Sequence, residues 1–164
     1  MAVKVQPRPA KFESGTAPRI AIVASEYNAE FVQALVNHTC KEIYLIDEGS
    51  VIELFGASGA FEIPVVAEIV AAKHRHDVII ALGLIMQGAT KHAEFIGQSV
   101  SFALQQVALK HTIPVIHEVL LVNSEGEARE RCIEKELNRG VEAARAAFVM
   151  LRVKQQLKDK PTSR

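Results

Sequence analysis

The chain has 164 residues, enough for one domain with its own hydrophobic core. Hydrophobic residues make up 49% and charged residues 23%, as in ordinary globular proteins, and the 19 basic and 19 acidic residues cancel. This balance gives no electrostatic reason to expect nucleic acid or a membrane surface as a partner, and no long-range repulsion opposes self-association.

The two ends of the chain are polar and irregular. Pro7, Pro9 and Gly15 indicate a flexible N-terminal arm over residues 1–17, with a short added strand at 11–13 as an option. Residues 158–164 are expected to fray, which leaves 18–157 as a single domain. No apolar run has the length of a secretory signal or a membrane span, so we expect a cytoplasmic protein.

Between the ends, strand-like and helix-like patterns alternate. In chain order they predict a strand at 19–24, a helix at 29–43, a strand within 44–55, a helix at 62–73, a strand at 77–84, a helix at 93–111, a strand at 113–122, and helices at 125–137 and 141–157. The strands are nearly continuous apolar runs, which predicts a four-stranded parallel sheet with helices on both faces. Ligands of such folds bind beyond the carboxyl ends of the strands.

The loop after the third strand reads Gln87-Gly88-Ala89-Thr90-Lys91-His92. Gly88 allows close approach to a ligand, and the following helix start offers free N–H groups to an anion. His92 is placed to exchange protons with a ligand held there. The alternative is structural: Thr90 caps the helix, and His92 is an exposed residue.

Two other strand ends carry polar and aromatic side chains. Gly59-Ala60-Phe61-Glu62-Ile63-Pro64 offers an aromatic face and a carboxylate, although an acidic residue at a helix start is favourable without any function. Tyr27 and Asn28 could stack on and hydrogen-bond a heterocycle, or Asn28 could simply cap the next helix.

The fourth loop and strand carry charged residues. Arg131 or Lys135 could supply a cation to a phosphate at Ala89 and Thr90, or both could belong to a solvated helix face. His117 and Glu118 lie inside an otherwise apolar strand, so they need hydrogen bonds, a strand end or an interface. Cys40 and Cys132 lack metal-ligand spacing and are expected to be small buried residues on helices, which argues against a zinc site or a disulfide.

Four of these motifs occur in one order: Tyr27-Asn28, GAFEIP, QGATKH and GEARERC followed by Lys135. Together they resemble the lumazine synthases over residues 19–151. The resemblance implies a flavodoxin-like three-layer α/β/α sandwich with a four-stranded parallel sheet. It implies condensation of 5-amino-6-(D-ribitylamino)uracil with 3,4-dihydroxy-2-butanone 4-phosphate to 6,7-dimethyl-8-ribityllumazine. Phosphate and water are released, and neither a metal nor a redox cofactor is required.

The resemblance also implies roles for individual residues. Tyr27 takes the position of the ring-stacking aromatic residue, with Asn28 beside it. The ribityl chain is held by Ala60, Phe61 and Glu62, and the pyrimidine edge is read by Leu84, Ile85 and Met86. The phosphate site comprises Ala89, Thr90 and Arg131. His92 is the catalytic, proton-transferring residue, and Lys135 lies near the pyrimidine. His117 takes the place of an aromatic residue that reaches the neighbouring subunit's site.

Members of the family form homo-pentamers, often twelve of them in a hollow icosahedral shell, with active sites between subunits. The absence of an insertion within residues 133–140 favours the 60-subunit shell, but Pro18 and the long arm leave pentamer or shell open.

Gln87 stands where the family commonly has Arg, and His117-Glu118 where an aromatic and a small residue are common. Leu121 and Ser58 also depart, from a common Thr and a common Pro. These differences support one alternative, a catalytically weak paralogue that binds flavin-like ligands or serves as a shell protein. An unrelated nucleotide-binding module is disfavoured because no glycine fingerprint for phosphate follows the first strand.

Overall fold

The computed structural model describes residues 6–13 and 15–159. The strands are β1 (Arg19–Ser25), β2 (Val51–Ala57), β3 (Val78–Met86) and β4 (Val115–Val122). The helices are α1 (Ala29–Ile46), the short 3-10 turn η1 (Ala60–Glu62), α2 (Ile63–Ala72), α3 (His92–His111), α4 (Glu125–Cys132) and α5 (Arg139–Asp159). The described helices include none that is long and apolar enough to cross a membrane.

The four strands form one parallel sheet in the order β2-β1-β3-β4. This order is that of a flavodoxin-like sheet, 2-1-3-4-5, without its last strand. β3 lies inside the sheet, and its residues are buried from Val78 to Ile85, as its continuous apolar sequence predicts. The predicted fold class is therefore confirmed.

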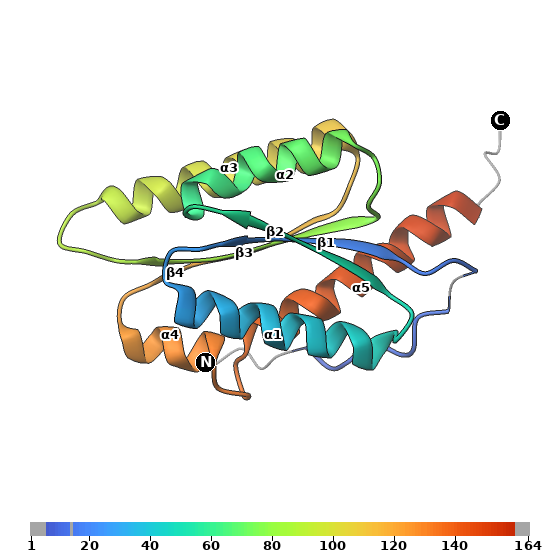
Figure 1. Ribbon diagram of the computed structural model, residues 1–164, viewed down its shortest axis with the longest axis horizontal. Helices are drawn as coiled ribbons and strands as arrows, with labels where there is room; N and C mark the ends of the chain where they lie inside the picture. Colours follow the sequence, from blue (N-terminus) through green and yellow to red (C-terminus); the bar gives the residue numbers. More distant parts are fainter. Residues whose placement is uncertain (1–5, 14, 160–164) are drawn as a thin grey trace.

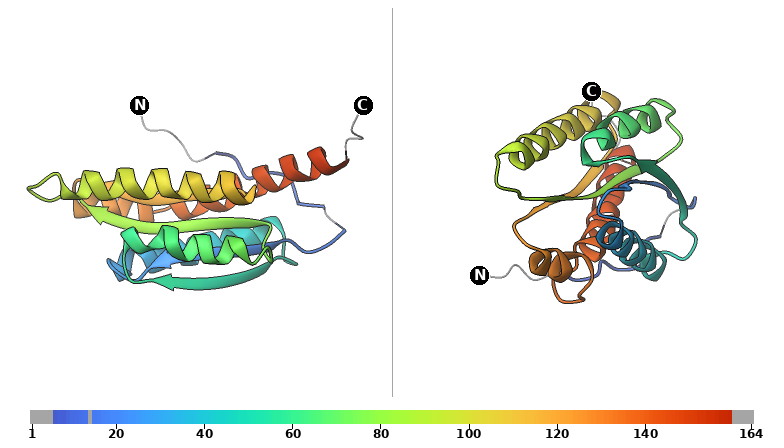
Figure 2. Two further views of the ribbon diagram at one scale, coloured as in Figure 1. Left: turned by 90° about the horizontal axis from the view of Figure 1, so that it is seen from above. Right: turned by 60° about the vertical axis from the view of Figure 1, so that its left-hand side comes forward.

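Helices cover both faces of the sheet and make three layers (Figure 1; Figure 2). α2 and α3 pack on one face, over a core that includes Val23, Ile79 and Leu104. α1, α4 and α5 pack on the other face, where Phe148 is fully buried beside Leu35. Because all strands run the same way, their carboxyl ends share one edge, at the left of Figure 1.

The N-terminal segment packs against α1 and α5 of the same chain. The guanidinium of Arg8 donates to both oxygens of Glu42, at 2.8 and 2.9 Å, and Arg145 donates to the same carboxylate at 2.8 Å. Phe12 is buried against Phe148, with ring centroids 5.4 Å apart. The optional strand at 11–13 is wrong, because these residues bury an aromatic ring on a helix instead of pairing with the sheet.

Two helix ends differ from the sequence prediction by three residues or more. α1 continues to Ile46, which is buried, so the second strand begins only at Val51. α4 ends at Cys132 and not at 137, because the buried side chain of Asn138 takes up backbone carbonyls that a further helical turn would have bonded. Its Nδ2 donates to the carbonyls of Cys132 and Glu134, at 3.0 and 2.9 Å, and its Oδ1 accepts from the Val141 N–H at the start of α5.

Candidate active site

A cavity of about 580 Å³ opens at the carboxyl edge of the sheet. It lies among the ends of β1 and β3, the turn η1 and the first turns of α3. Its lining comprises Tyr27, Asn28, Gly59, Ala60, Phe61, Glu62, Leu84, Ile85, Met86, His92, Ala93 and Ile96. Nine of the fourteen site residues predicted from the sequence therefore line this one cavity.

Asn28 ties two strand ends together. Its backbone takes the left-handed conformation, at φ 56°, and its side chain makes no cap to α1. Instead, Nδ2 donates to the carbonyl of Leu84 at 2.8 Å, across to the end of β3. This bond fixes the strand end and leaves Oδ1 facing no donor among the described residues. The simple cap is thus the wrong interpretation. The ring of Tyr27 beside it is 72% exposed and available for stacking.

The wall opposite is made by η1 and the start of α2. Phe61 is exposed, Glu62 is half-buried, and Pro64 occupies the first turn of α2, where its missing N–H costs nothing. The Glu62 carboxylate folds back over Gly59, where a Cβ would lie 2.9 Å from its Oε2. No described donor holds this carboxylate, so both of its oxygens can accept from hydroxyl groups of a ligand.

The loop between β3 and α3 protrudes at the same end of the molecule (Figure 2). The Gln87 amide donates within the loop, to the carbonyls of Gly88 and Thr90 at 3.3 and 3.2 Å. Thr90 Oγ1 accepts a long bond from the His92 backbone N–H, at 3.4 Å, but Thr90 is not the cap of α3. The cap position belongs to Lys91, and no side chain caps it, so that alternative is wrong. Ala89 and Thr90 are exposed and do not line the cavity, whereas His92 does. Gln87 therefore stabilises the loop and supplies no charge.

Three nominated residues lie elsewhere in the protomer: His117, Arg131 and Lys135. None of them lines the cavity in the described part of the chain. Arg131 is on α4, where its Nε donates to Glu127 at 3.0 Å, and Lys135 is exposed in the turn that follows. Arg131 and Lys135, on α4 and the turn after it, thus belong to a second surface, which we call the α4 surface.

Glu118 lies on β4, beside the α4 surface, and its carboxyl group has a strongly shifted pKa. Burial raises its pKa to about 7, against the opposing effect of Arg139 and Arg131, while Glu142 raises it further. Both arginines are already paired, Arg139 with Glu142 and Arg131 with Glu127. Glu118 therefore stays partly protonated near neutral pH.

The cysteines lie on helices, and both are free. Cys132 is buried, as predicted, whereas Cys40 is only half-buried. Burial raises the pKa of the Cys132 thiol to about 12, so it is not a reactive thiolate. Within residues 6–13 and 15–159, no cluster of three or more His, Cys, Asp or Glu could hold a metal ion.

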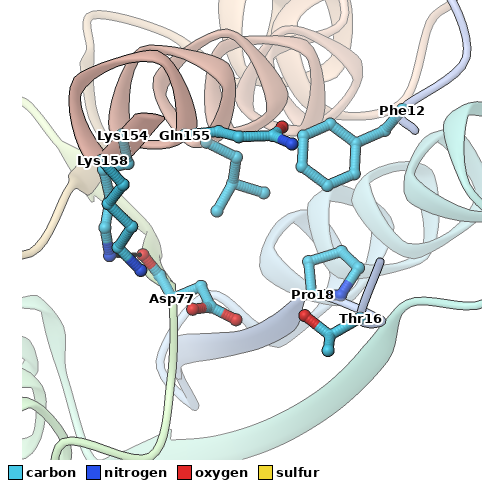
Figure 3. Close-up of a pocket in the computed structure, with 8 residues that line it drawn as sticks. Phe12, Thr16, Pro18, Asp77, Lys154, Gln155 and Lys158 are labelled. Carbon is cyan, nitrogen blue, oxygen red and sulfur yellow. Dashed lines mark hydrogen bonds between the residues drawn. The ribbon is translucent and has the colours of Figure 1, made fainter. Parts of the chain in front are cut away.

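A smaller cavity of about 220 Å³ lies at the opposite, amino-terminal edge of the sheet. Figure 3 shows Lys154 and Lys158 extending from α5 toward Asp77. Lys154 Nζ donates to the Asp77 carbonyl at 2.9 Å, and the Asp77 carboxylate accepts from the Arg19 N–H at 2.9 Å. These two bonds anchor α5 and the start of β1 to the Asp77 loop, so we assign these groups a structural role.

Sequence reasoning missed Ala93 and Ile96 as lining residues. A signal was present, since positions 92 and 96 share one face of a helix. It also missed Ser101, which contacts His117 from α3. Sixteen residues separate the two, and no local pattern connects them.

Comparisons with known proteins agree on one family. A sequence model of the 6,7-dimethyl-8-ribityllumazine synthases matches residues 17–155. The chain is 31% identical to the 6,7-dimethyl-8-ribityllumazine synthase of Coxiella burnetii over 140 residues, which cover 85% of this chain and 93% of that protein. It is also 31% identical to the enzyme of that name from Leuconostoc mesenteroides over 151 residues, covering 91% and 96%.

Among solved structures, a de novo designed Rossmann fold protein is 15% identical, with a TM-score of 0.39 over 68% of this chain and 91% of that one. That likeness is too slight to bear on function. The family match spans β1 to α5, including every residue of the cavity and of the α4 surface. This chain belongs to the 6,7-dimethyl-8-ribityllumazine synthase family.

Proposed function

We propose that the protein condenses 5-amino-6-(D-ribitylamino)uracil with 3,4-dihydroxy-2-butanone 4-phosphate to 6,7-dimethyl-8-ribityllumazine, in riboflavin biosynthesis. The observation that carries the proposal is the cavity at the carboxyl edge of the sheet. It brings an exposed aromatic ring, a carboxylate without a described donor, strand-end backbone groups and a histidine to one place, in a chain of this family.

Each group in the cavity suits one part of this chemistry. The Tyr27 ring stacks on the pyrimidine, and the main chain of Leu84 to Met86 reads its polar edge. The Glu62 carboxylate accepts hydrogen bonds from the ribityl hydroxyls. The substrate amine attacks the ketone carbon, water leaves as the Schiff base forms, phosphate is eliminated, and a second condensation with loss of water closes the ring.

His92 moves protons between these intermediates. It lies in the cavity one residue into α3, next to the loop that presents Ala89 and Thr90. The N–H groups of that loop and helix start receive the phosphate. Holding two substrates in reacting geometry supplies much of the acceleration, and proton transfer by His92 adds about 10²-fold.

A second copy of the chain completes the site. The cavity of one protomer has no cation for the phosphate among its lining residues, while Arg131 and Lys135 stand on the α4 surface away from it. A contact that joins the cavity of one copy to the α4 surface of the next brings the cations to Ala89 and Thr90. Such a head-to-tail contact is heterologous, the type of contact that builds a ring when its rotation closes.

Two exposed apolar stripes support this assembly. Phe95, Phe102 and Leu109 recur every seven residues along α3. Phe61, Val65 and Ile69 recur every four residues along η1 and α2. Large apolar side chains gathered on an exposed face mark protein–protein contacts. We therefore propose a homo-pentamer, with the 60-subunit shell as its larger form, working in the cytoplasm; gel filtration and electron microscopy distinguish the two sizes.

The test is direct. Purified full-length protein with both substrates should form the lumazine, detected by its absorbance and fluorescence, well above the rate without protein. Lys41→Ala, on the exposed side of α1 and outside the cavity and both apolar stripes, is a control that should retain this rate, whereas His92→Ala should lower it. A rate no faster than the uncatalysed reaction would instead identify a ligand-binding or shell paralogue.

A further inference from the structure

His117 belongs to a chain of three hydrogen bonds, two of which involve its own ring. It lies on β4, at the edge of the sheet, and its Nδ1 accepts from the backbone N–H of Val119 at 3.1 Å. Its Nε2 lies 2.7 Å from Ser101 Oγ on α3. Ser101 Oγ in turn donates to the carbonyl of Gly97, one helical turn earlier, at 2.8 Å.

These contacts fix where each proton sits. Nδ1 must carry a lone pair, because it accepts from a main-chain N–H that cannot turn away. The serine proton is committed to the Gly97 carbonyl, so Ser101 Oγ must accept from His117. Nε2 therefore bears the ring proton. Partial burial lowers the pKa of His117 and favours this neutral ring over the imidazolium.

We propose that Ser101 is a positioning residue that locks His117 as the neutral Nε2–H tautomer, so that His117 presents a fixed ring face to substrate and transfers no proton. This inference rests on the proposed function, and on the resemblance that gives His117 the place of an aromatic residue reaching the neighbouring subunit's site. Both ring nitrogens are already bonded within the protomer. What remains for a ligand is the flat face, which is what an aromatic residue would offer there.

The same arrangement rules out a serine nucleophile. A histidine activates serine by accepting the hydroxyl proton at a free nitrogen. Here Nε2 is the donor, and the serine proton points to a helix carbonyl. A neighbouring groove of about 650 Å³, lined by both Ser101 and Val119, is therefore no covalent site, although it borders this pair.

The tautomer can be measured without any assay of turnover. Full-length protein labelled with 15N in histidine, sedimented and measured by magic-angle-spinning NMR at pH 7.5, should show one ring with a protonated Nε2 and an unprotonated Nδ1. The signal is assigned to His117 by its loss in His117→Phe. A protonated Nδ1 at this position, or a doubly protonated ring, overturns the proposal.

Two variants then test the role of Ser101. Without Ser101 Oγ the His117 ring is no longer held against the Val119 N–H, so it should turn away in Ser101→Ala and give a mixture of tautomers. Ser101→Thr, which keeps the hydroxyl, should restore the single form. Ser99→Ala, exposed on the same helix two residues earlier, should leave the His117 signal unchanged. An unaltered tautomer in Ser101→Ala would refute the positioning role.

Kinetics separate positioning from proton transfer. Ser101→Ala should raise KM for the pyrimidine substrate about fivefold, the worth of one hydrogen bond, with little change in kcat. A fall in kcat without a rise in KM would mean that His117 handles protons, and would overturn the proposal. If no lumazine forms with wild-type protein, the proposed function fails, while the NMR result still decides the tautomer.

Discussion

Gly140 allows a direct test of how closely α5 packs on α1, behind the α4 surface. It is the second residue of α5 and is buried against α1. A Cβ added to it would lie 2.5 Å from the carbonyl oxygen of Leu35 and 3.1 Å from Thr39 Oγ1. The first distance is about 1 Å short of an ordinary contact. Because the obstacle is main chain, Gly140→Ala must push α5 away from α1.

The cost combines three effects. Overpacking of this kind costs about 1–3 kcal/mol. Moving α5 also weakens the bond that Thr39 Oγ1 donates to the Gly140 carbonyl at 3.0 Å, worth about 1 kcal/mol. The better helix propensity of alanine offsets about 1 kcal/mol. The net loss is about 2 kcal/mol, which should lower the urea midpoint by about 1 M.

Gly126→Ala is the matched control. Gly126 is also the second residue of its helix, α4, but a Cβ there meets only Ser124 Oγ, at 3.8 Å. Urea unfolding of both variants, followed by circular dichroism at one protein concentration, should lower the midpoint of Gly140→Ala alone. Equal midpoints for the two variants would refute the argument that the helices touch at this glycine.

Three further predictions concern charge and chemistry. The pKa of Glu118 is raised from 4.5 to about 7 in the folded protein. Between about pH 4.5 and 7 the folded protein therefore keeps a proton that the unfolded chain has released, and the free energy of unfolding falls as the pH rises. Glu118→Gln should remove that decline, of at most about 3 kcal/mol, in urea midpoints at pH 5.5 and 8; an equally steep decline in the variant would contradict the assignment. Arg131→Ala should raise KM for the butanone phosphate about 10- to 100-fold, as the loss of a charged hydrogen bond does, with Arg131→Lys closer to wild type; an unchanged KM would remove Arg131 from the phosphate site. His92→Ala should lower kcat about 100-fold while pyrimidine binding, measured by fluorescence titration, persists; loss of that binding would give His92 a different role.

Much of the fold follows from local sequence. The apolar run at 77–84 predicts a strand buried on both faces, and β3 is buried from Val78 to Ile85. Alternation of such runs with helical patterns fixes a parallel sheet, and the parallel sheet places the strand-end loops together. Tyr27, Glu62 and His92 could therefore be assigned to one cavity from their positions after three different strands.

Long-range polar contacts could not be predicted in this way. Asn28 looks like a helix cap, but its amide crosses 56 residues to Leu84. The Asn138 side chain bonds both to the end of α4 and to the start of α5. As a result, α4 ends five residues before its predicted end. The partner of such a side chain depends on the packing of distant elements, and neither periodicity nor spacing contains that information.

The separation of His92 from Arg131 within one protomer has a genetic consequence. A ring subunit that lacks the histidine still offers an intact arginine face to its neighbour, and one that lacks the arginine still offers an intact cavity. Two impaired variants, His92→Ala and Arg131→Ala, should therefore complement each other when they are co-expressed and assayed with the butanone phosphate below its KM. With random mixing, about a quarter of the interfaces in a heterologous ring join two intact halves, so roughly a quarter of the activity should return.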